Sequence, residues 1–216
     1  MDTVAQGGAA SPPRPAPEAA RLLSVTRRVA SLSILLALLL ELFLLLVAVF
    51  SGSFHGMEPF LGDAVQKIAW SFLLCAGLAL GLTIAGANVG MVALAAIVAA
   101  PVASLVAHGL LEAVHAVAFG TSAPAGPSPF AIALLRGLEY ACLGAVVAGL
   151  SIRAALRLHH HALVGLVTGV LFGSILLLLT SWPAMPAISA LVLLPWAINE
   201  VLFPVGCAII LYLVRE

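Results

Sequence analysis

The sequence predicts an all-α integral membrane protein with six transmembrane helices in a compact bundle. Its mean hydropathy is +1.20 and only 8% of its residues are charged, whereas soluble domains average about 25% charged residues. Its apolar runs are continuous instead of alternating over about ten residues, which excludes the strands of a membrane barrel. The chain is therefore expected to bury one side of each helix against other helices and to turn the other side to lipid.

Six segments are long enough to cross a hydrocarbon layer of about 30 Å, for which a helix needs about 20 residues. Polar, proline or glycine residues separate them. We expect a six-helix transmembrane domain over residues 29–216, with helices at residues 29–50, 66–86, 89–117, 131–153, 162–182 and 187–213.

The N-terminal segment has a different composition. Residues 7–20, "GGAASPPRPAPEAA", contain almost no large apolar side chains, so they cannot bury enough surface to offset the entropy lost on ordering. We predict a disordered cytoplasmic tail over residues 1–28. A cleaved signal peptide is a poorer explanation, because the apolar run after Arg28 is about 22 residues long and no A-x-A site follows it.

Lysine and arginine residues predict the orientation. With a cytoplasmic N-terminus, seven of them lie on the cytoplasmic side and two, Lys67 and Arg136, on or near the other side. We therefore expect both termini in the cytoplasm and a multi-pass protein of the plasma membrane, specifically a bacterial inner membrane. The seven cytoplasmic residues are Arg14, Arg21, Arg27, Arg28, Arg153, Arg157 and Arg215.

Glycine spacing favours close packing of the predicted helices. Gly77 and Gly81 form one G-x-x-x-G pattern, and Gly165, Gly169 and Gly173 form two in succession. In lipid, small residues at this spacing allow helix backbones to approach each other. Cys75, Cys142 and Cys207 all lie inside predicted helices without a C-x-x-C spacing, so we interpret them as packing residues and not as ligands or disulfide partners.

Two acidic residues are predicted near the middle of helices. A charge at this depth costs about 2.5 to 3.5 kcal/mol on insertion scales, so each such residue should face protein or water. Glu41 lies in "LLLELFLLL" and needs a partner from another helix or a proton. Glu200 lies between Pro195 and Pro204 and next to Asn199, where the prolines free backbone carbonyl groups.

Arg136, Glu139 and Tyr140 lie at i, i+3, i+4 on one arc of the fourth predicted helix. One interpretation is an internal ion pair between Arg136 and Glu139, because a buried charge requires a partner. In the other, Arg136 recognises an anionic group and Glu139 orients it, since the guanidinium fork fits carboxylate or phosphate. The sequence leaves both open.

His108, Glu112 and His115 fall within about 60° of one helix face. We expect His108 and Glu112 to turn into the bundle and to line an outward-facing polar vestibule that leads towards Glu41 and Glu200. The same three residues are candidate ligands for a divalent metal or part of a proton path. Alternatively, His115 and Glu112 lie at the headgroup level without a function. Haem is disfavoured, because the two histidines are about 10 Å apart along one helix.

These features favour a small-solute or ion permease, or the substrate-binding membrane subunit of a transporter. The alternatives are a membrane-embedded metal-dependent enzyme and a non-catalytic scaffold subunit. No H-E-x-x-H, G-x-S-x-G or P-loop pattern is present, so an enzyme is less favoured and no nucleotide is expected. The expected partners are the lipid bilayer and membrane subunits, and not nucleic acid. The predicted substrate or ion path comprises Glu41, His108, Glu112, Arg136, Glu139, Asn199 and Glu200.

Overall fold

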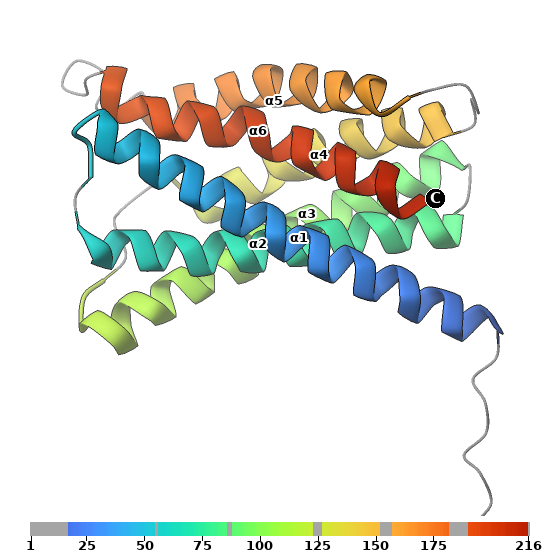
Figure 1. Cartoon of the computed structure of the whole chain (residues 1–216), viewed down its shortest axis with the longest axis horizontal. Helices are drawn as coiled ribbons and strands as arrows, with labels where there is room; N and C mark the ends of the chain where they lie inside the picture. The colour runs from blue at the N-terminus through green and yellow to red at the C-terminus, as the bar shows by residue number, and fades with distance from the viewer. Residues whose placement is uncertain are drawn as a thin grey trace, which may run out of the picture.

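The computed structural model describes residues 17–54, 56–85, 88–122, 127–151, 157–181 and 190–215, and within these ranges all regular structure is helical. Each of the six helices is long and apolar enough to span a membrane, so the all-α class with six spans is confirmed (Figure 1). In chain order the elements are α1 (Pro17–Phe50), α2 (Met57–Ala85), α3 (Val89–Val114), the π-helical turn η1 (His115–Phe119), α4 (Pro129–Ser151), α5 (Leu158–Ser181) and α6 (Ala190–Arg215).

Four helices begin earlier than expected from the sequence, and for α1 and α2 the difference is largest. α1 begins at Pro17, where the fixed backbone angle of proline suits the first helical position. Residues 17–28, expected to belong to a disordered tail, are therefore helical, and the alanine, leucine and arginine residues there favour that conformation. Residues 1–16 of the expected tail lie outside the described residues. α2 begins at Met57 instead of residue 66, which moves Lys67 away from the end of the helix.

The helices follow one another around the bundle. Each helix packs against the next in the chain, and α6 closes the ring by packing against α1. α6 also contacts α2 and α4, so it meets four of the other five helices. This arrangement places one face of α6 in the centre of the bundle, where its side chains meet those of α2 and α4.

Small residues bring the helix backbones together, as their spacing predicted. A Cβ atom at Gly165 of α5 would lie 2.6 Å from the Pro204 carbonyl oxygen, and one at Gly169 would lie 2.8 Å from that of Val201. α5 therefore packs directly on the backbone of α6. In the same way, a Cβ atom at Gly77 of α2 would lie 2.6 Å from the Ala99 side chain of α3.

The bundle has two distinguishable ends. We call one of them the distal end: α1, α3 with η1, and α5 finish there, and α2, α4 and α6 begin there. It lies on the left in Figure 1, opposite the end labelled C.

Candidate functional site

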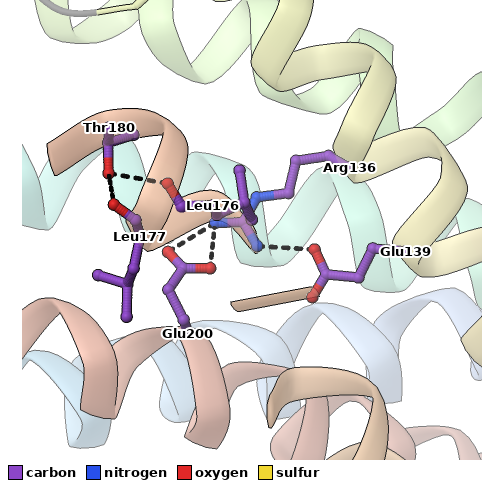
Figure 2. Close-up of polar contacts among 6 residues, drawn as sticks. All are labelled: Arg136, Glu139, Leu176, Leu177, Thr180 and Glu200. Carbon is purple, nitrogen blue, oxygen red and sulfur yellow. Dashed lines mark hydrogen bonds and ion pairs between the residues drawn. The ribbon is translucent and has the colours of Figure 1, made fainter. Parts of the chain in front are cut away.

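The distal half of the bundle contains an arginine that is paired with two glutamates. Arg136 Nη1 donates to Glu139 Oε2 at 2.8 Å, and Arg136 Nη2 lies 2.7 Å from both carboxylate oxygens of Glu200. Figure 2 shows the guanidinium group between the two carboxylates. The Glu139 side chain is fully buried, and the other two are each 14% exposed. We call these three residues the Arg136 cluster.

Two helices position the cluster. Arg136 and Glu139 are one turn apart on α4, whereas Glu200 comes from α6. At 1.5 Å per residue, Arg136 lies about 10 Å and Glu200 about 15 Å along their helices from the distal end. On α4, Gly137 permits close contact with α3, because a Cβ atom there would lie 2.9 Å from the ring of Pro101. The charges therefore lie between packed helices, well inside the apolar spans.

Three aromatic rings lie beside the cluster. The Arg136 Cζ atom is 5.5 Å from the ring centroid of Trp70 on α2, within the range of a cation–π interaction. Trp70 also packs edge to face on Tyr140 of α4 at 5.7 Å and lies 6.1 Å from Phe203 of α6. These rings limit the access of water to one side of the guanidinium and strengthen its attraction to the carboxylates.

Several oxygen atoms near the cluster have no hydrogen-bond donor among the described residues. They are Glu139 Oε1, Tyr140 Oη and Asn199 Oδ1, and Glu139 and Tyr140 are both fully buried. Thr180 of α5 does not supply the donor, because its hydroxyl donates to the carbonyl oxygens of Leu176 and Leu177 on its own helix (Figure 2). The site therefore contains buried oxygen atoms whose hydrogen-bonding capacity is unused among the described residues.

Proline adds a further acceptor to this set. Pro204 has no N–H group, so the carbonyl of Glu200, four residues earlier, lacks its usual helical partner. That carbonyl lies next to α5, because a Cβ atom at Gly169 would be 2.9 Å from its oxygen. Glu200 thus presents a carboxylate to Arg136 and a freed backbone carbonyl to the glycine stripe of α5.

Glu41 takes its partner from another helix. Its Oε2 atom lies 2.6 Å from Lys67 Nζ of α2, and Asp63 Oδ2 is 3.4 Å from the same nitrogen. The Glu41 side chain is 8% exposed, so this ion pair is largely removed from solvent. The sequence indicates that Glu41 needs a partner but does not identify Lys67, because the expected second helix begins only at residue 66.

The expected inward orientation of Glu112 is wrong. The Glu112 side chain is 62% exposed and lies 3.4 Å from His108 of its own helix. His115 is instead buried, with Nδ1 3.3 Å from the Thr121 hydroxyl and its ring beside Gly62 of α2. Glu112 therefore lies on the outer surface of α3 and does not line the expected vestibule.

The alanine pattern of α3 explains this difference. The buried residues of this helix are Val92, Ala96, Ala100, Ala103 and Ala107. At 100° per residue, His108 and Glu112 lie about 120° and 160° from the centre of that stripe. The stripe of small residues was a signal that could have identified the buried face. His115 is covered because the first turns of α2 extend over this part of α3.

The candidate metal ligands do not come together. Among the described residues, no group of three or more histidine, cysteine, aspartate or glutamate side chains could hold a metal ion. A different pair of side chains, unanticipated from the sequence, does meet: the thiols of Cys75 on α2 and Cys207 on α6 are 3.3 Å apart and fully buried. Cys142 is exposed on α4.

Comparisons with protein-family models, with curated protein sequences and with solved structures found no match to this chain. The class of the protein therefore follows from the molecule itself. Its six apolar helices fit a multi-pass membrane protein. Of the two groups in which one cation pairs with two carboxylates in the described part of the bundle, the Arg136 cluster is the less exposed.

Proposed function

We propose that this chain is a permease for a small solute or ion, or the substrate-binding membrane subunit of a transporter, and that the Arg136 cluster is part of its path. The observation that carries the proposal is the pairing of Arg136 with both Glu139 and Glu200 between α4 and α6. Charged groups at this depth are costly and usually mark a substrate, ion or proton pathway.

The structure of α6 supports this proposal. Pro195 and Pro204 lie inside the continuous helix α6 on either side of Glu200, and prolines in a membrane helix free carbonyl groups for ligands where the backbone is buried in protein. Transporters commonly bind their substrates and coupling ions at helices that contain proline or glycine within the span. Glu200 combines this backbone context with a charged side chain. Asn199, the preceding residue, adds a buried amide oxygen, Oδ1.

We also propose a subcellular location and an orientation for the protein. We assign the chain to the plasma membrane, specifically a bacterial inner membrane, with both termini in the cytoplasm, because lysine and arginine residues are concentrated on one side of the spans. In this orientation the distal end faces outward. The Arg136 cluster and the Glu41–Lys67 pair then both lie in the outer half of the membrane, within about 15 Å of that surface.

Flux measurements with purified protein in liposomes test the proposed function. The probes are sodium, potassium, chloride, phosphate and a set of neutral amino acids, each under an imposed gradient and with protein-free liposomes as the reference. We expect flux of at least one probe, reduced at least tenfold by Glu200→Gln. The matched control is Ser174→Ala on the exposed side of α5, which should retain the flux. A flux that Glu139→Gln and Glu200→Gln both leave unchanged would show that the cluster is structural.

A further inference from the structure

The charges of the Arg136 cluster do not balance. One guanidinium is paired with two carboxylates, so the fully ionised cluster carries one net negative charge. The Glu41–Lys67 pair uses its own cation, since Lys67 already contacts Glu41 and Asp63. A net charge between apolar helices is unfavourable unless it acquires a counter-charge. The cluster therefore needs one further positive charge.

The neighbouring groups cannot provide that charge. On α4 the carboxylates pair with Arg136, and Tyr140 lies within electrostatic range of both. On α6, Cys207 lies within electrostatic range of Tyr140. α2 contributes the neutral ring of Trp70. Next to the cluster, Pro101 of α3 packs against Gly137 of α4, and Gly173 of α5 packs against Glu200; these residues are uncharged. Apart from Arg136, none of these groups is a cation.

The unpartnered oxygen of Glu139 indicates where the charge binds. Oε2 accepts from Arg136, but Oε1 has no donor among the described residues although the side chain is fully buried. A bound proton neutralises the excess charge at this oxygen and requires no additional ligands. A metal ion requires several convergent ligands, and the described residues contain no group of three acidic, histidine or cysteine side chains suited to one. The geometry therefore favours a proton over a metal cation.

We propose that the Arg136 cluster binds one exchangeable proton, carried by Glu139 and shared electrostatically with Glu200. This inference deepens the proposed function, on which it rests for its role in transport, because it names the coupling ion of the same site. Protonation cancels the excess charge and weakens the hold of Arg136 on Glu139, since a neutral carboxyl attracts a guanidinium less than a carboxylate does. Arg136 then pairs mainly with Glu200 of α6, so proton binding shifts the guanidinium from a contact within α4 towards the contact between α4 and α6.

Infrared spectroscopy of the protein in lipid tests proton binding without any transport substrate. We expect the wild-type protein at neutral pH to show a carbonyl band of one protonated carboxyl group that Glu139→Gln removes. The band should disappear at alkaline pH. Asp63→Asn, which changes the half-exposed carboxylate beside Lys67, is the control and should retain the band. Absence of the band at every pH, or its persistence in Glu139→Gln, would overturn the proposal.

Thermal unfolding in detergent gives an independent readout. Wild-type stability should fall as the pH rises, because the folded cluster loses its proton and regains a buried negative charge. Glu139→Gln keeps the cluster neutral, so its melting temperature should exceed that of the wild type at alkaline pH by on the order of 5 °C. If the wild type and this variant respond identically to pH, the cluster does not bind a proton.

Two further measurements, the effect of sodium on the melting temperature and the flux of the probes, distinguish the remaining outcomes. At alkaline pH, we expect the wild-type protein to have the same melting temperature in sodium chloride as in choline chloride of equal concentration. A higher melting temperature in sodium chloride alone would identify a sodium site and overturn the proton proposal. A proton band without flux of any probe contradicts the proposed function alone. Flux that depends on Glu200 in a protein without the proton band contradicts the coupling ion alone.

Discussion

Gly173 of α5 lies directly against Glu200 of α6, so that a Cβ atom at position 173 would be 2.8 Å from the Cβ atom of Glu200. Glycine at this position therefore sets how closely the backbone of α5 approaches the residue that Arg136 holds. Any larger side chain must displace Glu200 or separate the two helices.

Replacement of Gly173 with alanine should destabilise the protein by about 1–3 kcal/mol, the usual cost of overpacking a close contact. The melting temperature in detergent measures this effect. Gly149→Ala on α4 is the matched control, because nothing lies within 4 Å of a Cβ atom there. Helix propensity should make that substitution neutral or slightly stabilising. Equal melting temperatures for the two variants would contradict the close packing of α5 on Glu200.

Removal of the guanidinium should cost more than removal of the whole cluster. Arg136→Met leaves Glu139 and Glu200 without their cation, and loss of one partner from a buried pair typically costs about 3–5 kcal/mol. The triple variant that adds Glu139→Gln and Glu200→Gln should recover most of that stability, because no buried charge remains. Chemical or thermal unfolding of both variants measures the difference. A triple variant less stable than Arg136→Met would show that the side chains contribute through packing instead of charge.

The ion pair between Glu41 of α1 and Lys67 of α2 should respond to loss of its cation in the same way. Lys67→Met leaves Glu41 buried next to Asp63 without a cation, whereas Lys67→Met combined with Glu41→Gln removes both main charges. We expect the single variant to be less stable than the double variant, with a coupling of about 1–3 kcal/mol in a double-mutant cycle. Additive effects would mean that the 2.6 Å contact contributes little to stability.

Oxidation should cross-link α2 to α6. Copper–phenanthroline removes two electrons and two protons from a pair of thiols, and Cys75 and Cys207 are the thiols that lie 3.3 Å apart. In membranes treated in this way, we expect both to be protected from later alkylation under denaturing conditions and released again by reductant. Cys207→Ala should leave Cys75 alkylatable, and Cys142→Ala should not affect the cross-link. Full alkylation of the oxidised wild type would contradict the proximity of the two thiols.

Labelling of single cysteines in intact cells tests the orientation. In a Cys142→Ala background, Ser122→Cys at the distal end should react with a membrane-impermeant maleimide. His159→Cys at the other end should react only after permeabilisation. A reporter fused after Glu216 should be cytoplasmic. The reverse pattern would place the Arg136 cluster in the cytoplasmic half of the membrane.

The sequence predicted the parts of this structure that depend on local composition and spacing. Apolar runs identified all six spans. The spacing of Arg136 and Glu139 by three residues permitted a contact within one helix, one of the two interpretations left open, and the structure has this contact at 2.8 Å. The contact between Arg136 and Glu200 joins residues 64 positions apart. It depends on how α6 packs inside the ring, which no local pattern specifies.

The features that the sequence predicted incorrectly also have physical explanations. The start of α2 is less apolar than the rest of the helix, so the hydrophobic pattern missed it and left Lys67 unrecognised as the partner of Glu41. His108 and Glu112 were expected to face the bundle because they are ionisable. The alanine stripe of α3 was the better guide to burial, since close helix packing in lipid depends on small residues.

The ring of helices consists of two units: the hairpin of α5 and α6, and the group of α1 to α4. α5 and α6 are joined by backbone contacts along the glycine stripe, and their mutual interface is more extensive than the contacts of either helix with α1, α2 or α4. A rigid displacement of this hairpin against α1–α4 would therefore break fewer contacts than a movement that separates α5 from α6. The ion pair between Arg136 and Glu200 crosses this seam. It therefore joins the α5–α6 hairpin to α4 across the less extensive of the two kinds of interface.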